Sequence, residues 1–101
     1  MTGQRPKQPR IRLSPAKYRK LCEYVHARDG GRCVFCGNPN NLTPAHIQRR
    51  SAGGHDAPNN IVCACIVAAD GSKGCHQRFD AYEIELPELV RKMLDGEPES
   101  F

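Results

Sequence analysis

Two cysteines, Cys33 and Cys36, are separated by two residues and followed by Gly37. This spacing lets a tight turn point two thiolates at one metal ion, and the glycine supplies the backbone freedom that the turn needs. Cys-x-x-Cys also occurs in thioredoxin-like redox sites, where a strand precedes the motif and a helix follows it. Here the polar run at residues 38–41 predicts a turn instead of a helix. A short strand over residues 32–37 that runs into a turn therefore favours a zinc knuckle.

A tetrahedral zinc site needs two further ligands, and Cys63, Cys65 and Cys75 can supply them. Cys75-His76 is similar to a second knuckle whose Cys-x-x-Cys spacing has been stretched by residues 66–74. We therefore expect Cys65 and Cys75 to join the first two cysteines around one structural Zn²⁺ per chain, with Cys63 left over. Six cysteines can also form three disulfides, but no export signal is evident, so thiolate ligands in a reducing compartment are favoured.

His76 and Asp80 are four residues apart, so on a helix that begins near Cys75 they lie on one face, one turn from each other. Such a pair can chelate a divalent cation. The spacing alone is common, and its position directly after a zinc ligand is what makes it a candidate cation site.

The order of these motifs along residues 30–80, about half of the chain, resembles the HNH endonuclease family of ββα-metal nucleases. The residues that carry the resemblance are, in order, Cys33-x-x-Cys36-Gly37, Asn41-Leu42-Thr43-Pro44-Ala45-His46-Ile47, Arg49-Arg50-Ser51-Ala52-Gly53-Gly54, Pro58-Asn59-Asn60-Ile61-Val62, Cys65 and Cys75-His76. The ordered combination is much more specific than any one of its parts.

The resemblance implies an α+β chain with a small ββα-metal (HNH) fold, a structural zinc site, an N-terminal helix and a short C-terminal helix. It also implies a metal-dependent endonuclease that hydrolyses DNA phosphodiester bonds. His46 matches the family's general base, which activates water, and Asn60 matches the middle Asn, which braces the strand of the base. His76 and Asp80 would hold the catalytic cation, Mg²⁺ or another divalent ion. Many members carry a metal ligand directly before the base, where this chain has Ala45, so we expect weaker metal binding.

The positive charge is concentrated at one end of the chain, although the formal net charge is only +4. Residues 1–20 hold basic side chains and no acidic ones, whereas acidic residues dominate residues 81–101. A cationic segment attracts a phosphate backbone regardless of its sequence. The side chains that we expect on DNA are Lys17, Lys20, Arg49 and Arg50. Because no base-reading helix is evident, we expect double-stranded DNA to be bound with low intrinsic sequence specificity.

Two other function classes stay open. One is a non-catalytic zinc-containing module that binds nucleic acid through its basic residues. The other is an adaptor domain whose zinc only folds it and whose acidic end binds a protein. For the arginine pair, a solvated surface is the simpler interpretation. The sequence also leaves open whether the protein is a monomer or a homodimer.

Two helices are expected to support these motifs. Ser14-Pro15 is typical of a helix start, because serine caps the first turn and proline fits its first position. The helix should end at Gly30-Gly31, and its apolar stripe is Tyr18, Leu21, Cys22 and Val25. A second helix should follow Pro87, with a packing side of Leu86, Leu89, Val90 and Leu94.

The chain of 101 residues divides into three segments. We expect a flexible basic arm at residues 1–12, the HNH nuclease domain at residues 13–95 and a frayed acidic tail at residues 96–101. No run of about 18 apolar residues occurs, so no membrane segment is expected. A cytoplasmic location, in a bacterium or a phage-infected cell, fits these features.

Overall fold

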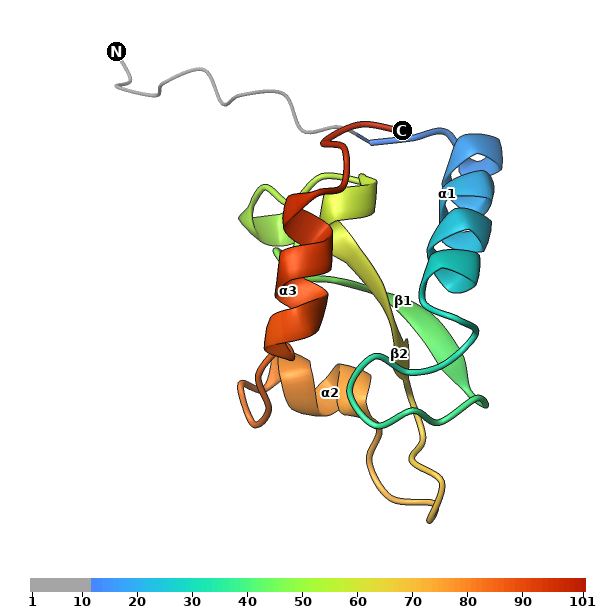
Figure 1. The fold of residues 1–101 in the computed structure, drawn as a ribbon, viewed down its shortest axis with the longest axis vertical. Coiled ribbons are helices and arrows are strands. Elements are labelled where there is room, and N and C mark those ends of the chain that lie inside the picture. Colours follow the sequence, from blue (N-terminus) through green and yellow to red (C-terminus); the bar gives the residue numbers. More distant parts are fainter. Residues whose placement is uncertain (1–11) are drawn as a thin grey trace.

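The computed structural model describes residues 12–101, so the arm expected over residues 1–12 lies, except for Arg12, outside the described residues. The described part is a small mixed fold of helices and strands (Figure 1), which agrees with the expected α+β class. Its elements are α1 (Pro15–Arg28), β1 (Leu42–His46), the 3-10 helices η1 (Arg50–Ala52) and η2 (Pro58–Asn60), β2 (Ile61–Cys65), α2 (Cys75–Asp80) and α3 (Glu88–Asp95). None of the helices within residues 12–101 has both the length and the apolar character needed to cross a bilayer.

β1 and β2 form an antiparallel sheet of two strands, in which His46 at the end of β1 lies opposite Ile61 at the start of β2. Neighbouring side chains of a strand point to opposite faces, so Ala45 and His46 face different sides of this sheet. Figure 1 shows α1 on one side of the strands and α2 and α3 on the other. The sheet therefore separates two packing regions.

Each region has its own apolar core. Beneath α1 the buried side chains are Leu21, Val25, Ile61 and Cys63. Beneath α2 and α3 they are Cys33, Ala45, Val62, Ala64, Cys65, Cys75, Leu86 and Leu94. Fully burying a leucine or valine contributes about 1.5–3 kcal/mol. Most of the buried residues of the second core are alanines and cysteines, and larger, partly buried side chains such as Phe35 and Phe79 pack against them.

α1 begins and ends where the sequence predicts. The Ser14 hydroxyl accepts a hydrogen bond from the backbone N–H of Lys17 at 3.4 Å, and Pro15 occupies the first turn. After the helix, Gly30 has a φ of +74°, a conformation that glycine adopts without a steric penalty. Leu21 and Val25 are fully buried against the sheet.

Arg28, the last residue of α1, has a side chain that is mostly buried. Its guanidinium donates to Asp29 at 2.9 Å and to Glu97 at 3.0 Å. It also donates to the carbonyl oxygens of Pro58 at 2.7 Å and Ile61 at 2.6 Å. The many donors of one guanidinium thus join the end of α1, the start of β2 and the C-terminal segment.

The packing side of α3 differs from the sequence prediction at one residue. Leu89, expected on that side, is 81 % exposed, because Val90 and Leu94 define the face that meets the core. The tail at residues 96–101 makes several contacts with the rest of the protein. Its contacts are Tyr24 Oη to Glu97 at 2.8 Å, Asn59 N–H to the Pro98 carbonyl at 3.2 Å, and the rings of Tyr24 and Phe101 at 5.7 Å.

Candidate functional site

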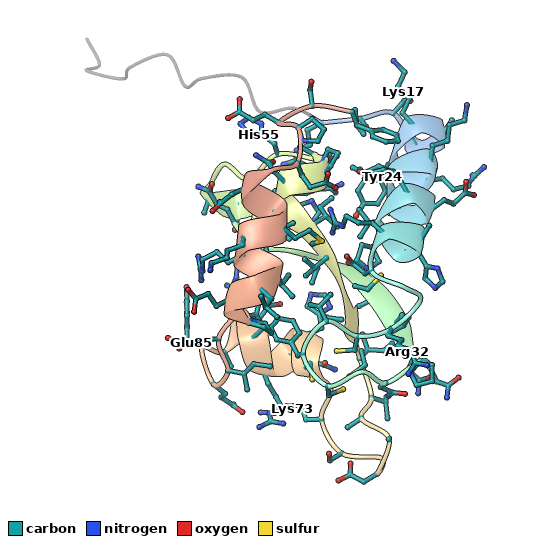
Figure 2. The ribbon with its side chains drawn as sticks, viewed as in Figure 1. Lys17, Tyr24, Arg32, His55, Lys73 and Glu85 are labelled. Carbon is teal, nitrogen blue, oxygen red and sulfur yellow. The ribbon has the colours of Figure 1, made fainter. Side chains whose placement is uncertain are left out.

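Four cysteines, Cys33, Cys36, Cys65 and Cys75, bring their Sγ atoms within 4.8 Å of one another. Several of the yellow sulfur atoms in Figure 2 lie between α2 and the loop that follows α1. The Sγ atoms of Cys36 and Cys65 are 3.7 Å apart. A zinc tetrahedron with Zn–S bonds of about 2.3 Å has sulfurs about 3.8 Å apart. The cluster can therefore hold a metal ion, and its four thiol ligands are those that a structural Zn²⁺ prefers.

The backbone around the cysteines brings these thiols together. Residues 32–37, expected to include a short strand, form a turn in which the Gly37 N–H donates to the Cys33 carbonyl at 2.8 Å. On the opposite side of the cluster, Gly74 precedes α2, and a Cβ atom there would lie only 2.3 Å from the Cys65 carbonyl oxygen. Only glycine lets the start of α2 approach the end of β2 this closely.

The thiols of this cluster ionise unequally in the metal-free chain. Burial raises the pKa of Cys75 and of Cys36, and the neighbouring cysteines raise that of Cys75 further. Burial also opposes ionisation of Cys33, but hydrogen bonds from the backbone of Cys36, Phe35 and Cys65 outweigh it and lower its pKa. A divalent cation would convert all four thiols to thiolates, because only a strong positive charge offsets four negative sulfurs in one small volume.

Cys63 lies outside the cluster, on the α1 side of the sheet. Its side chain packs with Leu21, Val25 and Ile61. Burial, followed by the charge of Asp29, raises the pKa of its thiol to about 11. The structure thus agrees with the choice of Cys65 over Cys63 as the fourth cluster member.

A second group of polar side chains, here called the His46 cluster, comprises His46, Arg50, Asp56 and Tyr18. His46 Nε2 lies 2.9 Å from Asp56 Oδ1, and the Asp56 side chain is only 1 % exposed. Arg50 donates to both carboxylate oxygens of Asp56, each at 3.0 Å, and the Leu13 N–H donates to Oδ2 at 3.1 Å. Burial opposes ionisation of Asp56, but these hydrogen bonds outweigh it and lower its pKa.

Tyr18 of α1 covers the His46 cluster. Its ring is nearly parallel to the His46 ring, with centroids 6.3 Å apart, and the Arg50 guanidinium lies 4.9 Å from its centroid. Burial is the main reason that the pKa of Tyr18 rises to about 12. The phenol therefore stays neutral at physiological pH, and the His46 side chain is left 14 % exposed.

Asn60 makes the bracing contacts that its position predicts. Its Oδ1 accepts from the Gln48 N–H at 2.8 Å. Its Nδ2 donates to the carbonyl oxygens of Gln48 and His55, each at 3.0 Å. These bonds hold the chain just after His46 against the start of β2. Asn60 therefore acts on the position of His46 and does not touch its ring.

His76 and Asp80 lie together on α2, with His76 Nε2 3.4 Å from Asp80 Oδ2. Ala45 is fully buried in the core on their side of the sheet. Within residues 12–101, the four cysteines make up the one group of three or more His, Cys, Asp or Glu side chains with metal-ligand geometry. The pair can supply two protein ligands to a cation, and water or substrate must supply the others.

The expected DNA contacts divide into bound and exposed side chains. The Arg50 guanidinium donates hydrogen bonds to Asp56, so in this structure it contacts mainly the protein itself. Arg49 is exposed and donates to the Asp80 carbonyl, with its guanidinium 6.0 Å from the Tyr82 ring. Lys17 and Lys20 are exposed on α1, and Figure 2 shows Lys17 pointing away from the protein.

The structure brings the predicted residues into two groups instead of one. His46 faces α1 with its cluster, whereas His76 and Asp80 belong to the α2 side. In the described part of the chain, His46 interacts with Asp56 and Tyr18 but with neither member of the α2 pair. The sequence prediction also missed Asp56, whose only signal was an acidic residue after the Gly-Gly of the loop.

Comparison of the chain with models of known families, with curated proteins and with solved structures finds no match.

Proposed function

We propose that this chain is a metal-dependent endonuclease of the HNH type that hydrolyses DNA phosphodiester bonds. The observation that carries the proposal is the contact between His46 and the buried carboxylate of Asp56 at the end of β1. A histidine oriented by a fixed carboxylate is a common way to prepare a general base. The Asn60 brace and the cysteine cluster support the proposal because they follow the order of the HNH motif.

Asp56 would determine which nitrogen of His46 carries the proton. Its pKa is lowered, so the carboxylate is ionised at neutral pH and can only accept a hydrogen bond. In the neutral imidazole, Nε2 then carries the proton that is donated to Asp56, and Nδ1 keeps the lone pair. We infer that Nδ1 takes the proton from the attacking water, and that Asp56 stabilises the imidazolium that results.

His76 and Asp80 would hold the divalent cation, which supplies positive charge to the phosphate oxygens during hydrolysis. Two side chains that are partly exposed are a small ligand set for a resident ion. Such a set is compatible with Mg²⁺ or Mn²⁺ that binds together with substrate. The four-cysteine cluster would hold a structural Zn²⁺ and take no part in the reaction.

The exposed cations Lys17, Lys20 and Arg49 would position DNA through its phosphates. Contacts of this kind carry no sequence information and weaken with salt. We therefore propose low intrinsic specificity, with either a monomer or a homodimer as the active form.

A non-catalytic zinc module that binds nucleic acid is the second candidate. The observation that favours it is the division of the candidate residues between two faces of the sheet. Ala45 has no side-chain atom that could add a third ligand to the α2 pair of His76 and Asp80. In addition, Tyr18 covers the ring of His46. The basic side chains alone would then carry the function.

Nicking of supercoiled plasmid DNA by the zinc-loaded protein separates the two candidates. We expect cleavage with Mg²⁺ or Mn²⁺, no cleavage in EDTA, and a loss of about 10²–10⁴-fold in rate for His46→Ala. His26→Ala is the matched control, because His26 is an exposed histidine on α1. Absence of nicking with either ion, while DNA is still bound, would leave the binding module as the function. Full activity of His46→Ala would rule out His46 as the base.

A further inference from the structure

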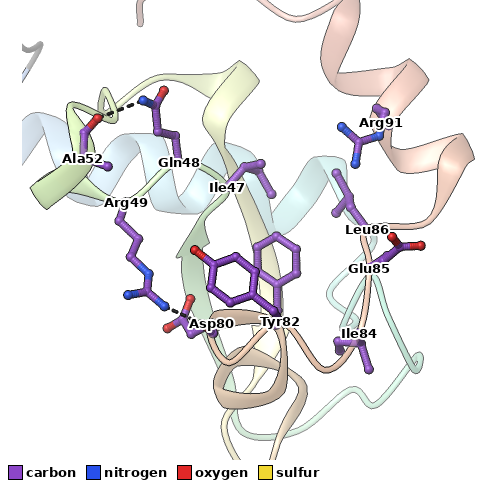
Figure 3. Close-up of a pocket in the computed structure, with 11 residues that line it drawn as sticks. Ile47, Gln48, Arg49, Ala52, Asp80, Tyr82, Ile84, Glu85, Leu86 and Arg91 are labelled. Carbon is purple, nitrogen blue, oxygen red and sulfur yellow. Dashed lines mark hydrogen bonds between the residues drawn. The ribbon is translucent and has the colours of Figure 1, made fainter.

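A pocket of about 440 Å³ lies between the loop that follows β1 and the segment that joins α2 to α3 (Figure 3). Its volume falls in the range of small-ligand sites. Apolar side chains form much of its lining, among them Ile47, Phe79 and Leu86. Figure 3 shows Arg49 and Arg91 on opposite sides of it. An apolar hollow between two cations suits a flat, uncharged group that carries a phosphate.

Tyr82 lines this pocket, and both its exposure and its backbone conformation are unusual for a tyrosine. It is 89 % exposed, and its φ is +61°, a conformation that bulky residues rarely adopt. The backbone is fixed there because the Tyr82 N–H donates to the Phe79 carbonyl at 3.0 Å, at the end of α2. An exposed aromatic ring on a strained residue indicates a functional constraint. Its open face can stack on a nucleobase of any sequence.

Arg49 lies beside this ring. One guanidinium nitrogen donates to the Asp80 carbonyl, and the guanidinium carbon is 6.0 Å from the centre of the Tyr82 ring. The bond to Asp80 orients the guanidinium and occupies one of its donors, and the other donors can meet phosphate oxygens. Glu85 adds a carboxylate to the lining, which can accept a hydrogen bond from the exocyclic amino group of a base.

We propose that this pocket binds one unstacked base of a single-stranded nucleic acid segment. The base stacks on Tyr82, and its flanking phosphates lie at Arg49 and Arg91. Bases with an exocyclic amino group fit better than thymine because they can donate to Glu85. The pocket thus combines the aromatic platform and the cations that single-strand binding requires.

The position of the pocket deepens the proposed nuclease function and, for cleavage, rests on it. Asp80 lines the pocket and belongs to the α2 pair that would hold the cation, on the side of the sheet opposite to His46. A base in the pocket then belongs to a nucleotide next to the bond that is cut. Extracting a base from a duplex costs unstacking and unpairing, whereas a single strand avoids most of that cost. The preferred substrate is therefore DNA that is unpaired beside the cleavage site.

Binding without cleavage tests the pocket. The probe is a short oligonucleotide with 2-aminopurine at its centre, used either as a single strand or annealed to its complement. It is mixed with the zinc-loaded full chain in the absence of Mg²⁺. We expect fluorescence quenching and tighter binding for the single strand. Tyr82→Asn removes the ring and suits a positive φ, so it should fold normally. It should bind the single strand about tenfold more weakly and abolish the quenching.

Two control variants keep the result specific. Tyr82→Phe retains the ring and should retain the quenching. Leu89→Ala removes an exposed apolar side chain outside the pocket and should bind as the wild type does. The proposal is overturned if Tyr82→Asn binds the single strand as tightly as the wild type, or if it weakens duplex binding equally. If the quenching is seen but no DNA is cut after Mn²⁺ or Mg²⁺ is added, the nuclease proposal fails and the base pocket stands.

Discussion

The cysteine cluster and the His46 cluster lie at opposite ends of one β-hairpin, and each contains buried acidic groups, three of the four cysteines at one end and Asp56 at the other. Cys65 ends β2 at one end, and His46 ends β1 at the other. At the cysteine end, burial raises the pKa of Cys75, and all four members of the cluster are cysteines. At the His46 end, three donors from the chain itself meet the Asp56 carboxylate.

Because of this difference, we expect the stability of the two ends to depend on different solution conditions. The cysteine end can take an ion from solution, because its four Sγ atoms lie close together and a cation would offset the charge of four thiolates. The His46 end is complete in the folded chain and requires only that Asp56 keeps its charge. Stability should therefore respond to chelators through one end of the hairpin and to acid through the other.

Loss of the metal should have the largest effect. Zinc bound to four cysteines contributes on the order of 10 kcal/mol, which equals the whole stability of a small domain. We expect Cys33→Ser, or treatment of the wild type with a strong chelator, to abolish cooperative thermal unfolding by circular dichroism. Metal analysis should show the loss of about one ion per chain.

Cys22→Ser is the matched control for this change. Cys22 is a partly buried cysteine of α1 outside the cluster, so its variant should keep the metal and unfold cooperatively. A Cys33→Ser protein that retains its metal and its unfolding transition would exclude the proposed ligand set.

Asp56→Asn should have the next largest effect. The substitution keeps the size of the side chain but removes the negative charge that Arg50 and His46 face. The amide NH₂ of asparagine would also point at N–H groups, which cannot accept a hydrogen bond from it. Breaking a buried ion pair in this way costs about 3–5 kcal/mol. Denaturant unfolding of the zinc-loaded protein measures the cost. Asp70→Asn, at an exposed aspartate that accepts hydrogen bonds from Ser72, should change the free energy of unfolding by less than about 0.5 kcal/mol.

The acid dependence of stability tests the same carboxylate without a mutation. The pKa of Asp56 is lower in the folded chain than its ordinary value of about 4. Its contribution to stability is therefore fully present above about pH 4 and is lost as the pH falls through the lowered pKa. The wild type should lose more stability than Asp56→Asn over this acid range. Equal losses in both proteins would contradict the assignment.

Features set by local sequence could be predicted, whereas features set by distant contacts could not. The Ser14 cap, the buried stripe of α1 and the pairing of Cys33 with Cys36 depend on residues within a few positions of one another. Asp56 was missed because its partners Arg50, His46 and Leu13 are 6, 10 and 43 positions away across an irregular loop, so no helix or strand spacing rule connects them. The contact of Arg28 with Glu97 is likewise invisible to local patterns, since the two residues are 69 positions apart.

The resemblance to the HNH motif implied one contact that the structure contains and one grouping of residues that it does not. It indicated Asn60 as a brace, and the hydrogen bonds of that side chain agree. It also implied a single site for His46 and the α2 pair. The alternation of β1 instead turns His46 toward α1, because Ala45 is the residue that faces α2.

Asn60→Ala should have the smallest of these effects on stability, about 1–3 kcal/mol, because three hydrogen bonds to backbone atoms are lost but no charge is left buried. Asn59→Ala is a strict control, since Asn59 is the same residue type one position earlier and bonds Pro98 through its backbone. Both proteins should keep their zinc, because the cysteine cluster lies at the other end of the hairpin. If Asn60→Ala loses nicking activity far beyond its loss of stability while Asn59→Ala does not, the brace serves the placement of His46. Equal activity of the two variants would show that the brace serves the fold alone.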